Sequence, residues 1–504
     1  MTKKSIAAAG ALALAVLVRL QPAPAADSAG GTPYPEFLSD PTGAIENYGN
    51  NGPIATTGAF FQSLGTNGRS CSTCHVASQA FGLSAAGVQA RYFLSGGRDV
   101  LFASVDGANC PSEPVNRPES HSLLLQSGLI RIPLQFPPAP PAQPQFTITV
   151  IHDPYGCAIS PDPNTGQPDV SVYRRPLPTT NLSFLSSVMF DGRETIEPLT
   201  SESTFMANLI TDLTHQATDA TLTHAQATQA PTANQLSDIV NFELGIYTAQ
   251  GFDLRAGRLD QLGADGGAVN AAALPYYPGI NDALGGDPTG ASFNPASMVL
   301  FAPWANLTEA DAFGFFGAEQ NAARREIAAG EALFNSAPIT ISNVRGLNDN
   351  AALGKPTSFV GHCTTCHDTP NVGNHSLPLP LDIGTGHSPL PGLENDPAIA
   401  AALAQLSFPN VPVYLINGCP NPFNAGQPVS FYTTDPGKAL ITGNCSDLNR
   451  VKGPILRGLA GRAPYFHNGA AASLLEVVNF YNQRFQMNLT EDQKSALVAF
   501  LNAL

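Results

Sequence analysis

Two short segments carry the side chains best suited to chemistry. Each has two cysteines separated by two residues and followed at once by a histidine, at 71–75 and at 363–367. In such a segment both thiols can add to the vinyl groups of a haem, and the histidine can bind its iron as the proximal ligand. A zinc site or a redox-active CxxC would leave the two histidines unexplained. We therefore predict two covalently bound c-type haems, held by Cys71, Cys74, His75, Cys363, Cys366 and His367.

The other four cysteines fall as one pair in each half of the chain. In a chain exported to an oxidising compartment, such cysteines form disulfides that pin loops. Closeness in the sequence favours pairing within each half. We therefore predict the disulfides Cys110–Cys157 and Cys419–Cys445.

The first 25 residues have the pattern of a cleaved secretory signal. Lys3 and Lys4 precede an apolar run from Ile6 to Val18, and Ala23-Pro24-Ala25 forms a small-residue cleavage site. The apolar run is too short for the alternative, a membrane anchor. Removal of residues 1–25 would take away three cations and no acid, which makes the mature protein more acidic.

Composition limits the class of protein. The chain has 504 residues, of which 43% are hydrophobic and 12% are charged, so it can build a core. The formal net charge of −15 argues against nucleic acid as the main partner. The 46 glycines and 44 prolines follow no collagen-like period and indicate long ordered loops. We expect no membrane span after residue 25.

The two halves share landmarks that indicate an internal repeat. Residues 231–242 and 489–500 both have threonine followed three positions later by glutamine, a capping box, and then apolar residues at helical spacing. Each CxxCH segment therefore begins a unit that closes with a matching helix.

The repeat predicts the domain organisation and the fold class. We expect an N-terminal cytochrome c-like domain at 26–262, a linker at 263–320 and a C-terminal cytochrome c-like domain at 321–504. An insertion at about 100–172 lengthens the first domain, and its β-patterned run at 146–150 predicts a small β excursion in the N-terminal half. The predicted fold is mainly α, with two haem domains and long loops.

Three further segments carry a resemblance. They are Ala-Pro-Tyr-Phe-His-Asn-Gly at 463–469, Phe-Asp-Gly-Arg at 190–193 and Arg-Pro-Leu-Pro-Thr at 175–179. With the two CxxCH segments, they resemble the bacterial dihaem cytochrome c peroxidase/MauG family. The resemblance implies a periplasmic enzyme that reduces hydrogen peroxide at its N-terminal haem. A small cytochrome or cupredoxin would deliver electrons through the C-terminal haem. Family members often form homodimers, which no feature of this sequence demonstrates.

The resemblance also implies ligands for the C-terminal haem. His367 would be proximal, and the sixth ligand would come from the helix after the Tyr-Phe-His segment: a methionine in the peroxidases, a tyrosine in MauG. Alignment of residues 474–481 on that helix puts Tyr481 at the ligand position. A tyrosine oxygen is a hard donor that lowers the reduction potential of the iron. Met487 competes if the register shifts, and a core tyrosine with a hydrogen-bonded hydroxyl is the other interpretation.

At the N-terminal haem, His75 is the predicted proximal ligand. The peroxidases place a distal histidine soon after the CxxCH segment, but no histidine occurs between Val76 and Ser120. We therefore expect this haem to have an open position. If a sixth ligand exists, its candidates are side chains that could equally be ordinary loop or core residues: His121, Met206, His215 and His224.

Peroxide cleavage needs a group that moves a proton from one oxygen to the other. The family uses a glutamate, and alignment puts Gln226 at its position, with His224 two residues earlier. Because an amide does not exchange a proton at neutral pH, we predict His224 as the acid/base catalyst. A helix-end histidine without a catalytic role is the alternative, and Asp219 and Glu243 are the fallback candidates.

Two other positions depart from the family. The tryptophan between the haems is replaced by Phe190, which is harder to oxidise, so we do not expect electron hopping through this side chain. The asparagine and threonine of the family's calcium site correspond to Pro176 and Arg462. We therefore expect the calcium site to be lost and Arg462 to pair with haem propionates.

The sequence leaves three functions open. The leading hypothesis is a periplasmic dihaem oxidoreductase that reduces hydrogen peroxide at the N-terminal haem. The second is a MauG-like oxidase or oxygenase that acts on a protein side chain or an organic substrate. The third is a dihaem electron carrier with no catalytic activity.

Overall fold

The computed structural model describes residues 35–138, 143–162, 165–196, 202–311, 314, 316–367, 379–423 and 430–504. The predicted secretory signal at 1–25 lies outside the described residues. None of the helices in the described ranges combines the length and apolar composition that a membrane crossing needs.

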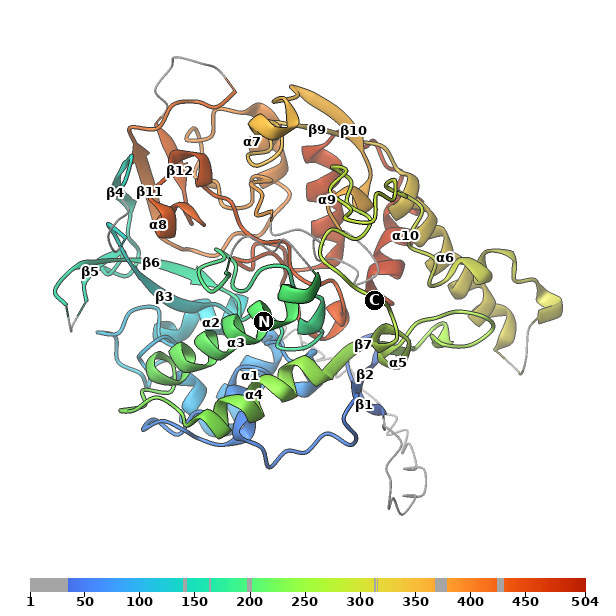
Figure 1. Cartoon of the computed structure of the whole chain (residues 1–504), viewed down its shortest axis with the longest axis horizontal. Coiled ribbons are helices and arrows are strands. Elements are labelled where there is room, and N and C mark those ends of the chain that lie inside the picture. The colour runs from blue at the N-terminus through green and yellow to red at the C-terminus, as the bar shows by residue number, and fades with distance from the viewer. Residues whose placement is uncertain are drawn as a thin grey trace, which may run out of the picture. The chain divides into compact units, whose positions relative to one another are not determined.

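The helices lie in both halves of the chain (Figure 1). They are α1 (Ala85–Ser95), α2 (Ser122–Ser127), α3 (Glu202–Thr223), α4 (Ala233–Gly245), α5 (Ala268–Ala272), α6 (Gly317–Ser336), α7 (Pro397–Leu403), α8 (Ala439–Thr442), α9 (Leu474–Arg484) and α10 (Glu491–Asn502).

The two predicted closing helices are confirmed as α4 and α10. Thr232 and Thr490 cap them, and each accepts a hydrogen bond from the backbone N–H of the glutamine three residues later. α4 packs against α3, whereas α10 packs against α6 and α9. A capping box and an apolar face thus start and place both helices.

Strands form four antiparallel sheets in the described ranges. Their orders are β1 (Pro35–Ser39), β2 (Gly43–Gly49), β7 (Ile246–Asp253) and β8 (Gly257–Arg258); β3 (Ile130–Gln135), β6 (Pro168–Arg174) and β5 (Ile159–Pro161); β12 (Phe431–Thr433), β11 (Val413–Asn417) and β4 (Thr147–His152); and β10 (Ser358–Gly361) with β9 (Ile339–Ser342). Strands therefore contribute regular structure beside the helices, and the mainly α, two-domain cytochrome fold stays a prediction.

The predicted insertion is tied to the C-terminal half. The β run expected at 146–150 is present as β4, and β4 pairs with β11 so that Thr149 lies opposite Leu415 (Figure 1). Side chains from both halves share the core beneath these strands: Phe136, Phe146, Val170, Tyr414 and Ile416. The sequence pattern did not predict this pairing, because β alternation indicates a strand but not its partner.

Both predicted disulfides are confirmed, Cys110–Cys157 within the insertion and Cys419–Cys445 in the C-terminal half. Cys419 and Cys445 also pack in the core that the insertion shares with β11. The two crosslinks therefore restrain the loops that surround this shared core.

A buried cluster of charges links residues far apart in the sequence. Arg174 at the end of β6 donates to Asp435 through Nε, at 2.6 Å, and through a second nitrogen, at 2.9 Å. Its remaining nitrogen donates to Asp191, which also binds Arg193. The side chains of Arg174, Asp191 and Asp435 are at most 2% exposed. Each charge is therefore compensated in a place that water does not reach.

We predict that Arg174→Met destabilises the protein by about 3–5 kcal/mol, because it leaves buried carboxylates without their main partner. The free energy of unfolding in urea measures this loss. Arg255→Met is the matched control, since the Arg255–Glu326 pair has its arginine 66% exposed. Its removal should cost less than about 1 kcal/mol. Equal losses in the two variants would contradict the structural role of the buried pair.

Candidate haem sites

The two CxxCH segments adopt the same local structure. Each begins with one turn of 3₁₀ helix, Cys71–Thr73 and Cys363–Thr365. The backbone N–H of His75 donates to the Cys71 carbonyl at 3.1 Å, and that of His367 donates to the Cys363 carbonyl at 2.9 Å. None of the four motif cysteines forms a disulfide. Both turns therefore present two thiols and a histidine from one short loop.

Each turn lines a large cavity. We call the space beside His75 the N-terminal cavity and the space beside His367 the C-terminal cavity. They enclose about 1340 Å³ and about 1460 Å³ of space without protein atoms, including parts open to solvent. The donor set of both cavities, two thiols and an imidazole in a mainly apolar wall, fits a covalently bound haem.

The imidazole of His75 is held by the backbone. Its Nδ1 lies 3.1 Å from the carbonyl oxygen of Phe81, and in the tautomer that donates this hydrogen bond Nε2 carries no proton. Burial also lowers the pKa of His75 to about 4, and the ring is neutral at neutral pH. A neutral imidazole whose second nitrogen is fixed by a carbonyl is the usual form of a histidine ligand.

Cationic side chains lie where the cavities adjoin. Arg175 lines both cavities, and Arg462 lines the C-terminal one. Burial and the neighbouring Arg462 charge lower the pKa of Arg175 to about 9, and burial lowers that of Arg462 to about 10. Arg462 Nε has no hydrogen-bond partner within the described structure. These two cations, with Pro176 beside them, favour an anion such as a haem propionate over a calcium ion.

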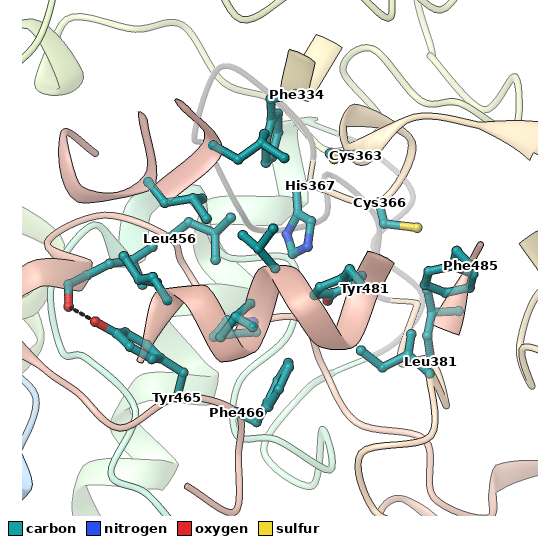
Figure 2. A pocket seen from close by; sticks show the side chains of 18 of the residues that line it. Phe334, Cys363, Cys366, His367, Leu381, Leu456, Tyr465, Phe466, Tyr481 and Phe485 are labelled. Carbon is teal, nitrogen blue, oxygen red and sulfur yellow. Dashed lines mark hydrogen bonds between the residues drawn. The ribbon is translucent and has the colours of Figure 1, made fainter. Parts of the chain in front are cut away.

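Tyr481 and His367 line the same C-terminal cavity (Figure 2). The ring centroids of the two side chains are 6.3 Å apart, and Tyr481 stacks on Phe485. Burial raises the pKa of Tyr481. Figure 2 shows the His367 imidazole above α9, the helix that carries Tyr481. Met487 lines the same cavity.

The Tyr481 hydroxyl forms no hydrogen bond with any described residue, whereas the nearby Tyr465 hydroxyl donates to the Leu459 carbonyl at 3.0 Å. A core tyrosine whose hydroxyl is satisfied, the other interpretation from the sequence, would resemble Tyr465. Tyr481 thus differs from Tyr465 in its hydroxyl, although its ring packs against Phe466, Phe480 and Phe485, and its ligand role stays a prediction.

One face of α3 lines the N-terminal cavity. Gln216, Ala220 and His224 follow one another on it at helical spacing. His224 immediately follows the helix, and its Nδ1 lies 2.5 Å from Asp106 Oδ2. The predicted acid/base residue is thus in the same cavity as His75.

Gln226 does not line this cavity, contrary to the position that the family alignment gave it. Because α3 ends at Thr223, the chain turns away and Gln226 adopts a φ of +54°. Its exposed side chain accepts a hydrogen bond from Asn67 Nδ2 at 3.3 Å. The family alignment would need α3 to continue past Thr223, and the helix ends there.

Several of the other candidate ligands and proton donors of the N-terminal half lie away from the N-terminal cavity. Both ring nitrogens of buried His121 bind backbone carbonyls at 2.7 Å, and His215 is bound by Glu194 at the surface. Met206 and Asp219 are exposed. Among these candidates, none lines the N-terminal cavity.

Glu243, a fallback candidate, does line the N-terminal cavity. Its Oε2 has no hydrogen-bond partner within the described ranges, and burial raises its pKa to about 8. The carboxyl is therefore mainly protonated at neutral pH and can donate a proton.

Lys452 is a cavity residue that the sequence analysis missed. It is 5% exposed, lines the N-terminal cavity, and has a pKa lowered by burial to about 7. Nothing in the motif pattern signals it, because a lysine in a loop is normally exposed. Its backbone N–H donates to the Phe190 carbonyl at 2.7 Å.

Phe190 contributes to the walls of both cavities. Its ring meets that of His467 edge to face, with centroids 6.0 Å apart. The predicted relay position is thus located where the two cavities adjoin, and an aromatic ring occupies it.

Replacing Tyr481 tests its predicted role at the C-terminal haem. We expect Tyr481→Phe to change the visible and electron paramagnetic resonance spectra of that haem, because the variant removes the phenol oxygen that would bind its iron. Met487→Leu is the matched control, and its spectra should equal those of the wild type. Spectra that respond to Met487→Leu and not to Tyr481→Phe would assign the ligand to Met487.

No family model matches the chain. The chain is 34% identical over 156 residues to a protein of Denitromonas iodatirespirans named cytochrome-c peroxidase IdrP2, which covers 29% of this chain and 36% of that protein. It is 41% identical over 70 residues to the cytochrome c551 peroxidase of Nitrosomonas europaea, covering 14% of this chain and 21% of the relative.

A third relative, cytochrome-c peroxidase IdrP1 of Denitromonas iodatirespirans, is 37% identical over 81 residues, which is 14% of this chain and 22% of that protein. The chain therefore spans between about a fifth and about a third of the length of these curated relatives. Over the matched segments, the chain is similar to proteins named cytochrome c peroxidases.

Proposed function

We propose that the chain is a dihaem c-type oxidoreductase that reduces hydrogen peroxide at the N-terminal cavity. The observation that carries this proposal is the N-terminal cavity itself, which contains both the fixed imidazole of His75 and the proton-exchanging side chain of His224. The similarity to proteins named cytochrome c peroxidases supports the same reaction class.

Cys71, Cys74 and His75 would hold one haem, and Cys363, Cys366 and His367 the other. Each haem would supply an iron that exchanges single electrons. Arg462 and Arg175 would compensate the negative propionates, because both guanidinium groups lack a carboxylate partner in the described structure.

His224 performs the proton transfer in this proposal. Reduction of one hydrogen peroxide to two waters consumes two electrons and two protons. Nδ1 of His224 is engaged by Asp106, so its Nε2 is the atom that takes a proton from one peroxide oxygen and returns it to the departing one. Protonated Glu243 is the second proton donor of the cavity.

The electrons come through the C-terminal site. Phe190 separates the two cavities and is hard to oxidise, so electrons cross this wall without residing on the side chain. The acidic chain suits a basic electron donor, for which we propose a reduced small cytochrome or cupredoxin. The secretory pattern at residues 1–25 supports a periplasmic location.

Spectroscopy of the ferric protein tests this function. We expect two haems per chain, one high-spin at His75 and one low-spin at His367. Hydrogen peroxide should convert the high-spin signal to a long-lived oxidised spectrum, because His224 supplies the proton transfer beside an open position. Two low-spin haems that do not react with peroxide would instead establish an electron carrier.

A second candidate function is favoured by Tyr481, whose ring lies beside that of His367 in the C-terminal cavity. A hard oxygen ligand lowers the reduction potential of the second site and makes it a better store of oxidising equivalents. The chain would then be a MauG-like oxidase or oxygenase that acts on a protein side chain or an organic molecule.

Steady-state turnover separates the two candidates. For the peroxidase, we expect peroxide-dependent oxidation of a reduced small cytochrome, with two cytochromes oxidised per peroxide consumed. Peroxide consumption that requires an added organic or protein substrate, and does not occur with the reduced cytochrome alone, would favour the oxidase.

A further inference from the structure

We propose that Asp106 and Arg69 position His224, so that the predicted insertion completes the proton-transfer site of the N-terminal cavity. This inference rests on the proposed function, in which His224 exchanges the proton. Asp106 and Arg69 are positioning residues here because they act through His224.

The three side chains form a continuous chain of contacts. Asp106 uses its two oxygens separately: Oδ2 lies 2.5 Å from His224 Nδ1, and Oδ1 accepts from Arg69 Nη1 at 2.5 Å. The Asp106 and Arg69 side chains are 4% and 3% exposed, whereas that of His224 is 35% exposed. A rigid buried pair therefore holds a histidine that opens to the cavity.

Arg69 is itself fixed at every nitrogen. Nε donates to the Val100 carbonyl and Nη2 to the Leu101 carbonyl, both at 2.8 Å. Nη1 reaches the His224 carbonyl at 3.2 Å in addition to Asp106. Arg69 stands two residues before Cys71, so the loop that carries the thiols also anchors the backbone of His224.

The insertion holds Asp106 from the other side. The Asp106 carbonyl accepts a hydrogen bond from the Arg131 backbone N–H of β3 at 3.0 Å. Asp106 lies between the end of the Val100–Phe102 turn and Cys110, which the disulfide to Cys157 restrains. The position of this carboxylate is therefore defined by the insertion, which lies outside the repeated cytochrome-like landmarks.

The contact with Asp106 determines which ring nitrogen of His224 can accept a proton. Burial raises the pKa of Asp106, but its hydrogen bond to His224 and the charge and hydrogen bond of Arg69 act in the opposite direction, so the pKa stays below its usual value and the carboxylate is ionised. An ionised carboxylate only accepts hydrogen bonds, so His224 must carry its proton on Nδ1. Nε2 is then the free base, and the carboxylate stabilises the imidazolium that forms when Nε2 takes a proton.

Cyanide binding to the ferric holoprotein tests this role without turnover. Hydrogen cyanide must lose its proton to a base as it binds, so its association rate reports on His224 Nε2. We expect His224→Gln to slow association about 100-fold and Asp106→Asn to slow it about tenfold or more. In the His224→Gln background, adding Asp106→Asn should change the rate less than about twofold.

Two further variants keep the test decisive. Asp260→Asn is the control, since Asp260 pairs with Arg258 and contacts none of Arg69, Asp106 and His224 in the described structure, and its rate should equal that of the wild type. Asp106→Asn leaves the buried Arg69 charge without its carboxylate partner and could prevent folding. The double variant Arg69→Met/Asp106→Asn removes both charges, and its cyanide association should be as slow as expected for Asp106→Asn.

The outcomes separate this inference from the proposed function. A wild-type rate in Asp106→Asn beside a slow His224→Gln would overturn the positioning role and leave His224 as the base. Equal slowing by Asp106→Asn with and without His224 would reveal general damage to the cavity and also overturn it. A wild-type cyanide rate and peroxide reaction in His224→Gln would refute the proposed function and this inference together.

Discussion

One buried arginine joins the two halves of the chain beside the cavities. Arg174 binds Asp191 from its own half and Asp435 from the other half, with all three side chains removed from water. In such surroundings each charge needs its partner, so the three segments must come together for the fold to be stable. Asp191 directly follows Phe190, which borders both cavities. These ion pairs therefore link segments of both halves next to a residue that borders the two sites, which exchange electrons in the proposed function.

The two sites have the same attachment turn but different surroundings. The C-terminal cavity has a tyrosine beside its histidine and is otherwise lined mostly by apolar side chains. The N-terminal cavity gathers ionisable groups around its histidine, including His224, Glu243 and Lys452. Electron transfer gains from a rigid apolar site, whereas peroxide reduction needs proton donors and acceptors. The two cavities therefore differ in the way expected if one haem transfers electrons and the other reduces peroxide.

Local patterns in the sequence predicted local structure well. The CxxCH segments, the capping boxes of α4 and α10, the strand β4 and both disulfides depend on residues close together in the chain, or on pairs within one half. Gln226 was misplaced because its position depends on where α3 ends. Asp106, Lys452 and the β4–β11 pairing were missed because only long-range packing brings these residues to their partners, and no local pattern encodes that packing.

A single-turnover experiment tests the central claim, that electrons stored at the His367 site reduce peroxide at the His75 site. The protein is reduced at the C-terminal haem alone and mixed in a stopped-flow instrument with a series of hydrogen peroxide concentrations, starting from one equivalent. We expect rapid oxidation of the C-terminal haem, at a rate that rises with peroxide concentration and falls strongly in His224→Gln. A C-terminal haem that stays reduced, or is oxidised at the same rate without His224, would contradict it.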